Sequence, residues 1–164
     1  MDPKIQDAIN AQVGLELSSA YVYLAMSAHF AGQNFEGFAR WMRLQAAEEL
    51  NHAMRLYDYV IERGGIVALP AVDAPPASFG TPLQVFQEAL DHERVVTASI
   101  HSLYDLAREA RDYATELQLQ WFVTEQVEEE ASAGLAVEQL RRAGDDMPAL
   151  LMLDQEFGKR TAEA

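Results

Sequence analysis

The stretch FEGFARWMRLQAAEELNHAMRLYDYVIER, residues 35–63, has the clearest structural pattern in this chain. Residues seven apart lie on one face of an α-helix, and a mainly apolar face is expected to turn toward a core. Glu49 and His52 interrupt two such lines and should therefore enter that core together. The two lines consist of Phe35, Met42, Glu49 and Leu56, and of Phe38, Gln45, His52 and Tyr59.

The same helical periodicity continues on both sides of this segment, between clusters of glycine and proline. It predicts helices over residues 3–31, 35–63, 82–110 and 113–143, and a short fifth helix that follows Asp145-Asp146 and ends near Gly158. Asp2, Thr81 and Asp112 are suitable N-cap residues, and Gly64 suits the left-handed end of a helix. The chain is expected to be all-α.

The connections predict how the long helices are arranged. Each long helix should span about 42 Å. The irregular stretch 64–80 can cover about 55 Å when extended, whereas the turns near Gly32 and Asp112 can join only antiparallel neighbours. The second and third helices should therefore run parallel, as in a four-helix bundle with one long crossover. The length of 164 residues suits one domain over residues 1–164.

Composition excludes several classes of function. The chain has no cysteine, so a metal site must use oxygen and imidazole ligands. A formal net charge of −14 argues against nucleic acid as a partner and favours attraction of cations. No apolar run is long enough for a membrane span, and the N-terminus does not resemble a secretory signal, so we expect a cytoplasmic protein.

Acidic residues interrupt the apolar lines of every long helix. Glu16 shares a line with Tyr23 in the first helix, Glu93 lies on such a line in the third, and Gln126 and Glu129 lie on adjacent lines in the fourth. Unpaired buried carboxylates are costly, so these acids and His52 should require a cation.

The spacing of these residues forms an imperfect repeat. Glu16 precedes Glu49 by 33 residues, and Glu93 precedes Gln126 by 33 residues. A glutamate from one helix and Glu-x-x-His from the next, presented twice, is how bundle cores hold two metal ions. The second copy has Glu129 in place of the histidine. Hard oxygen ligands with one imidazole suit iron or manganese, and two irons bridged by Glu49 would define a ferroxidase.

At these positions the sequence resembles the non-haem bacterial ferritins over essentially its whole length. The segments that carry the resemblance are Leu15–Ser19 with Tyr21 and Tyr23, Ala47–His52, Asp91–Arg94 and Trp121–Glu130. The resemblance implies a ferritin-like four-helix bundle that oxidises Fe(II) with O2 or H2O2 and stores the ferric product. It also implies a homo-oligomeric shell of twenty-four subunits (a 24-mer). The similar bacterioferritins have a histidine where Glu129 stands, so haem is not favoured.

By this resemblance, Glu16, Glu49 and His52 would hold the first iron. Glu49, Glu93 and Glu129 would hold the second, with Gln126 nearby. A third, outlying position would use Glu48, Glu125, Glu128 and Glu129. Tyr23 is interpreted as a core aromatic residue whose hydroxyl meets a carboxylate, with a redox role left open.

Four alternatives remain open on the sequence alone. The buried acids could form a salt-bridge network with Arg or Lys, and the outlying acids could simply be solvated. The chain could also be a discrete di-iron or di-manganese oxidase or peroxidase that stores nothing, or a metal-free helical interaction domain. His29, His92 and His101 have no matching partners and are expected at the surface.

Overall fold

The computed structural model describes residues 1–161, which form five helices. Their bounds agree with the predicted ones to within one or two residues, and the all-α expectation is confirmed. No helix in this part of the chain is long and apolar enough to cross a lipid bilayer. The helices are α1 (Pro3–Gly32), α2 (Glu36–Glu62), α3 (Pro82–Glu109), α4 (Tyr113–Ala143) and α5 (Met147–Phe157).

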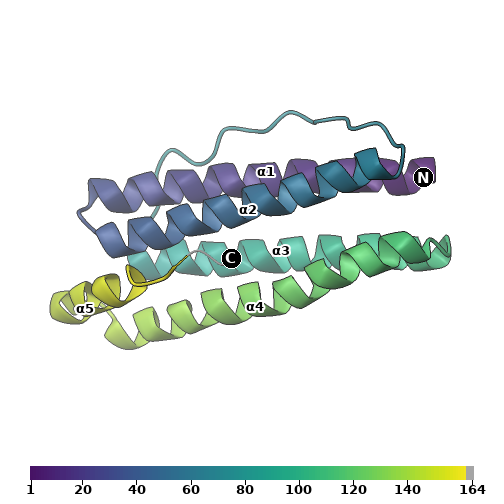
Figure 1. The fold of residues 1–164 in the computed structure, drawn as a ribbon. Helices are drawn as coiled ribbons and strands as arrows, with labels where there is room; N and C mark the ends of the chain where they lie inside the picture. Colours follow the sequence, from purple (N-terminus) through teal and green to yellow (C-terminus); the bar gives the residue numbers. More distant parts are fainter. Residues whose placement is uncertain (162–164) are drawn as a thin grey trace.

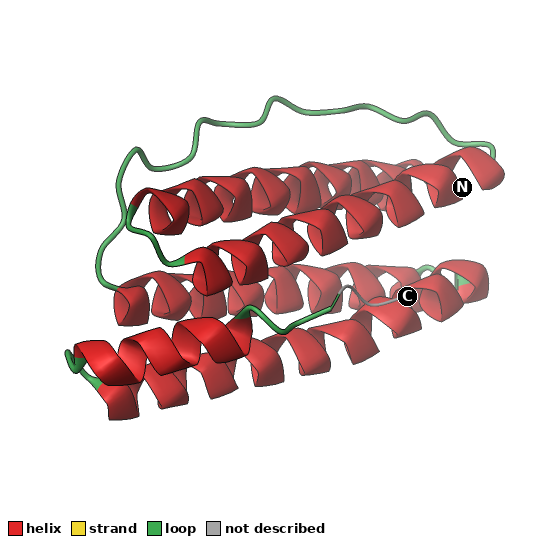
Figure 2. Ribbon diagram, turned by 60° about the vertical axis from the view of Figure 1, so that its left-hand side comes forward, coloured by secondary structure: helices red, strands yellow, loops and turns green. Residues whose placement is uncertain are grey.

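Two helical hairpins build the bundle. The hairpin of α1 and α2 lies on the hairpin of α3 and α4, and the long crossover runs back along the first hairpin before α3 begins (Figure 1). This return makes α2 and α3 parallel, as the length of the crossover predicts. The short α5 lies at the end of the bundle, where it contacts α2 and α4 (Figure 2).

The helix ends follow from local sequence chemistry. The Thr81 side chain accepts a hydrogen bond from the backbone N–H of Gln84, and the Gln84 side chain accepts one from the N–H of Thr81, which is a complete capping box. The Asp112 and Asp146 side chains cap α4 and α5, because each accepts a hydrogen bond from the backbone N–H three residues later. After α2, Gly64 takes a φ of +68°, a conformation that costs glycine little.

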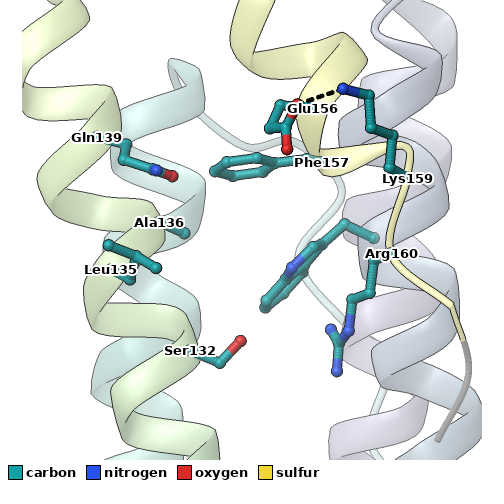
Figure 3. A pocket seen from close by; sticks show the side chains of 9 residues that line it. Ser132, Leu135, Ala136, Gln139, Glu156, Phe157, Lys159 and Arg160 are labelled. Atoms are coloured by element: carbon teal, nitrogen blue, oxygen red, sulfur yellow. Dashed lines mark hydrogen bonds and ion pairs between the residues drawn. The ribbon is translucent and has the colours of Figure 1, made fainter.

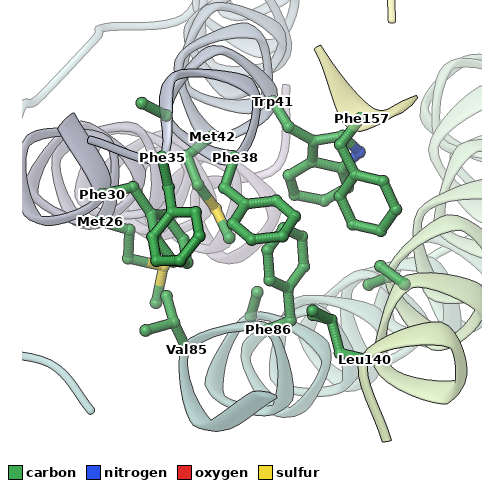
Figure 4. Packing of buried hydrophobic residues seen from close by; sticks show 14 of the residues in the cluster. Met26, Phe30, Phe35, Phe38, Trp41, Met42, Val85, Phe86, Leu140 and Phe157 are labelled. Atoms are coloured by element: carbon green, nitrogen blue, oxygen red, sulfur yellow. The ribbon is translucent and has the colours of Figure 1, made fainter. Parts of the chain in front are cut away.

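The apolar core is divided into two clusters. The cluster at the α5 end contains seven buried aromatic side chains, and in it Phe157 of α5 packs against Phe38 and Phe86 with ring centroids 5.3 and 5.4 Å away (Figure 4). The cluster at the opposite end is mostly aliphatic and includes Ile9, Leu56, Ile100 and Leu119. A fully buried side chain of this size contributes about 1.5–3 kcal/mol, so both clusters offset the cost of polar groups buried elsewhere.

The docking of α5 depends on a close backbone approach. A Cβ atom at Gly37 would lie 1.6 Å from the carbonyl oxygen of Asp154, so only glycine fits at this position of α2. The Asp154 carboxylate accepts a hydrogen bond of 2.8 Å from the backbone N–H of Phe38. This contact fixes the direction in which the chain leaves α5.

The crossover is held against α1 at its beginning. The Asn10 amide donates to the carbonyl oxygen of Ile66, and the Gln6 side chain accepts from the N–H of Ile66. Further along, Pro70 covers Gly14, where a Cβ would be 2.2 Å from the proline ring. Residues 71–78 are then almost all exposed.

Candidate metal site

A belt of buried polar residues lies between the two apolar clusters. Every long helix contributes at least one carboxylate to it, as the heptad lines predict. The exposed fraction is zero for Glu16, Glu49 and Glu93 and 5% for Glu129. The other buried polar members include Gln12, Ser19, Gln45, His52 and Gln126.

Glu16, Glu49 and His52 form the most compact group in this belt. The Nδ1 atom of His52 lies 4.0 Å from a carboxylate oxygen of Glu16 and 4.0 Å from one of Glu49. One ligand atom from each residue lies within 4.8 Å of the others. Glu49 and His52 meet because they are three residues apart on α2, and Glu16 joins them across the α1–α2 hairpin.

The electrostatics of this group favour a bound cation. Burial raises the pKa of Glu16, and burial together with the negative charges of Glu93 and Glu16 raises the pKa of Glu49 well above its usual range. Burial and the nearby Arg55 charge lower the pKa of His52 to about 4, so its imidazole is neutral at pH 7. Neither carboxylate oxygen of Glu49 has a hydrogen-bond partner among the described residues. Buried lone pairs in this state are suited to a metal.

The second hairpin presents Glu93 and Glu129 to the same belt. The Tyr23 hydroxyl donates to one Glu93 oxygen, and the Gln126 amide donates to the other at 3.3 Å. The amide of Gln45 donates to Glu129 at 2.5 Å. Burial raises the pKa of Glu93 to about 7, and burial with the Glu93 charge raises that of Glu129 to about 8.

The outlying acids are brought together only in part. Glu125 and Glu129 offer ligand atoms within 4.8 Å of each other and of His52. Glu48 is partly buried and forms an ion pair of 2.5 Å with Arg160. Glu128 is exposed on α4 and belongs to neither three-residue group found among the described residues.

Two features of the site were not predicted. Arg160 reaches Glu48 because the chain folds back after α5, and no heptad pattern extends that far. His92, expected at the surface, is half-buried, and its Nε2 atom lies 2.6 Å from Ser19 Oγ. The Ser19 hydroxyl already donates to the Leu15 carbonyl, so it accepts from His92. The sequence feature that could have indicated this position is that His92 directly precedes Glu93, a predicted core residue.

The salt-bridge alternative fails for the inner acids. No Lys or Arg in the described part of the chain forms an ion pair with Glu16, Glu49, Glu93 or Glu129. Several carboxylates around one neutral imidazole form a donor set for hard divalent ions such as Fe(II) or Mn(II). Fold and site together define a class: a four-helix bundle with one long crossover and a carboxylate-rich candidate metal site in its core.

Comparison with known proteins identifies the family. The ferritin-like domain profile matches residues 6–143. A bacterial non-heme ferritin of Bacteroides fragilis (strain 638R) is 43% identical over 157 residues, which cover 96% of this chain and 98% of that protein. One from Staphylococcus aureus (strain MRSA252) is 38% identical over 161 residues, covering 98% and 97%. The chain therefore belongs to the ferritin family.

A solved structure supports the same assignment. The open pore ferritin from the archaeon Archaeoglobus fulgidus superposes with a TM-score of 0.97 at 47% sequence identity. The match covers 98% of this chain and 99% of that one. The ferritin-like architecture and the resemblance to non-haem bacterial ferritins are both confirmed.

Proposed function

We propose that this chain is an iron-storing ferroxidase. It binds Fe(II) in the polar belt, oxidises it to Fe(III) with O2 or H2O2, and deposits the ferric product inside a shell of identical subunits. The observation that carries the proposal is the buried group of Glu16, Glu49 and His52, with Glu93 and Glu129 facing it from the other hairpin.

The assignment of two iron positions follows the family resemblance, and the distribution of charge supports it. Glu16, Glu49 and His52 would hold one ion, and Glu49, Glu93 and Glu129 the other, with Glu49 between them. The negative charges of Glu93 and Glu129 both raise the pKa of Glu49, which is consistent with all three carboxylates sharing one pair of cations. Binding would release the protons that these raised pKa values retain.

The proposed oxidation of Fe(II) balances in electrons and protons with O2 or H2O2 as the oxidant. Two Fe(II) ions give one electron each to O2, which takes up two protons and leaves as H2O2; with H2O2 as oxidant, the products are two waters. The carboxylates stabilise the ferric charge that develops. Tyr23 and Gln126 would orient Glu93, since both donate to its oxygens.

Storage requires assembly, which two observations favour. The chain matches ferritins over nearly its whole length, and large apolar side chains are exposed on the α1–α2 hairpin. Tyr21, Leu24 and Ile61 are 50%, 47% and 53% exposed, and an interface between subunits would cover such side chains. We propose the 24-mer shell that the resemblance implies.

The test combines oxidation kinetics with a measurement of size. Fe(II) is added in air to the purified protein, ferric absorbance is followed, and the product is separated by size-exclusion chromatography with light scattering. Glu49→Gln should slow oxidation by at least about a hundredfold, because a removed bridging ligand affects both ions. Glu88→Gln, at an exposed position of α3, is the matched control and should match the unmodified chain.

The outcomes separate the candidate functions. Iron that co-elutes with a particle of about twenty-four subunits supports storage. A small species with two irons per chain would replace storage by a discrete oxidase or peroxidase. Protein that binds no iron under these conditions would instead be a helical interaction domain, and oxidation unaffected by Glu49→Gln would refute the site.

A further inference from the structure

The described residues that follow α5 lie over the side of the bundle where α2 and α4 face each other. Among the described residues, no Cα atom of α2 comes within 8 Å of one of α4. A groove of about 440 Å³ remains there, lined by α2, α4, α5 and the residues after α5. Lys159 and Arg160 lie on one side of it, opposite Ser132 and Leu135 of α4 (Figure 3).

Arg160 points from this groove toward the metal belt. Its guanidinium donates to a carboxylate oxygen of Glu48 at 2.5 Å and to the side-chain oxygen of Gln45 at 2.7 Å. It also lies over the indole ring of Trp41, 4.7 Å from the centroid. The side chains of Arg160 and Glu48 are only 19% and 14% exposed, so this pair is poorly solvated.

A second hydrogen bond links Arg160 to the metal belt. Gln45, which accepts from Arg160, donates its amide to Glu129 at 2.5 Å. Glu129 in turn offers a ligand atom beside His52 and Glu125. A protein cation therefore lies within two hydrogen bonds of a carboxylate in the candidate centre.

Apart from the side chain of Arg160, the described residues after α5 are held mainly by hydrogen bonds to α5 itself. The neighbouring Lys159 is 71% exposed and pairs with Glu156 on that helix. The Arg160 carbonyl accepts a long hydrogen bond of 3.5 Å from Arg40. Since α5 is fixed separately by Asp154 and Phe157, Arg160 can leave Glu48 without undocking that helix.

We propose that Arg160 is an exchangeable internal cation, which neutralises Glu48 in the metal-free protein and is displaced when a divalent cation binds Glu48 at the outlying position. The inference rests on the proposed function. It adds that Arg160 competes with the metal ion for Glu48. A divalent cation on the Glu48 carboxylate would lie beside the guanidinium that donates to this carboxylate at 2.5 Å, and the repulsion between the two positive charges favours release of Arg160. Occupancy of the outlying position is thus coupled to the position of residues 159–161.

The test uses Zn(II), which binds oxygen and imidazole ligands without redox chemistry. Isothermal titration calorimetry on the assembled protein compares the unmodified chain with Arg160→Gln and with the control Lys159→Gln. Arg160→Gln removes the competing cation, so the affinity of the weakest, outlying class of Zn(II) sites should rise by about fivefold. A change of this size corresponds to the free energy of one partly buried ion pair. The inner position of Glu16, Glu49 and His52, with which Arg160 forms no described ion pair, should be unchanged, and Lys159→Gln should match the unmodified chain.

Trp41 gives an independent readout of the displacement. Its emission should change as Zn(II) fills the outlying position, because the guanidinium leaves the ring. The change should be absent in Arg160→Gln, which has no cation over the indole, and in Glu48→Gln, which lacks the ligand. Trp41→Phe identifies the part of the signal that belongs to this residue and not to Trp121.

The outcomes are distinct from those of the proposed function. If Zn(II) fills the inner sites but Arg160→Gln leaves the outlying affinity unchanged or weakens it, Arg160 is not a competitor and this inference is wrong. If Zn(II) fails to bind at the inner sites in every variant, the proposed function itself is refuted.

Discussion

The hydroxyl of Tyr23 donates a hydrogen bond to the carboxylate of Glu93. The donor is on α1 and the acceptor on α3, so a residue of the first hairpin positions a candidate ligand of the second. Tyr23 is 1% exposed, and burial together with the negative charge of Glu93 raises the pKa of its phenol well above the usual value. The tyrosine therefore remains protonated and acts as a donor at neutral pH.

Replacing Tyr23 by Phe should destabilise the metal-free protein. The change leaves one Glu93 oxygen without its donor, and a lost partner of a buried ionisable group costs about 1–3 kcal/mol. The pKa of Glu93 should rise further above about 7, since the hydrogen bond from Tyr23 lowers it. Urea unfolding at pH 6 and pH 8 measures both effects, with the larger loss expected at pH 8. Tyr21→Phe, at a half-exposed position of the same helix, should change neither.

The metal-free protein should lose stability between pH 6.5 and pH 8. The folded chain retains protons on Glu93 and Glu129, with pKa values of about 7 and about 8, whereas the unfolded chain has already lost them. Stability is therefore lost as the pH rises through these values, by about 2 kcal/mol in total. Below pH 6.5 the lowered pKa values of His52 and His92 have the opposite effect, because the unfolded chain binds protons there that the folded chain does not. This contribution to stability is lost as the pH falls.

Thermal unfolding across this pH range measures the loss. Glu129→Gln should make the decline shallower, and saturating Zn(II) should remove it because the metal replaces the protons. A stability that increased from pH 6.5 to pH 8 without metal would contradict the assigned burial of these carboxylates.

Gly37→Ala should loosen the docking of α5. The added Cβ would overlap the Asp154 carbonyl, and overpacking of this kind costs about 1–3 kcal/mol. Hydrogen exchange by mass spectrometry should show faster exchange in residues 147–157 with little change in α1 or α3. Gly134→Ala is the control, since nothing in the described structure lies within 4 Å of its added Cβ; it should be neutral or stabilise α4 by up to about 1 kcal/mol.

Asp112→Ala should weaken the junction of α2 and α4. Asp112 caps α4 through the N–H of Thr115 and pairs with Arg63 at the end of α2. Loss of the cap should cost about 1–2 kcal/mol in the free energy of unfolding. Asp105→Ala removes only an exposed pair of 3.9 Å with Arg108 and should cost less than about 0.5 kcal/mol. Equal losses in the two variants would show that the cap contributes nothing.

The heptad lines predicted the fold and most of the belt because burial depends on the face of a helix. Glu16, Glu49 and Glu93 each replace an apolar residue in a line of period seven, and each is fully buried. Their common level follows from helix lengths and turns, which the glycine, proline and cap residues determine. Topology and the position of the acids were therefore predictable from local chemistry and spacing.

What could not be predicted depends on contacts between segments with no shared periodicity. Arg160 approaches Glu48 only because α5 docks at Gly37 and sets the direction of the following residues. The pairing of Gln45 with Glu129 joins residues 84 positions apart on helices that touch through side chains alone. His92 is half-buried because it lies on the side of α3 that faces Ser19 of α1. The sequence does not indicate this rotation of α3, since a polar residue is compatible with an exposed or a half-buried position.

The middle of the crossover is exposed, so a cut there would divide the chain into two fragments, each with one hairpin. A cut within residues 71–78 would leave Glu16, Glu49 and His52 on one fragment and Glu93 and Glu129 on the other. Neither fragment would contain a full set of ligands, and each would expose the apolar face that the other covers. We expect the two fragments to recombine more tightly when a divalent metal is present, which would make the bundle a metal-dependent split reporter for use in cells.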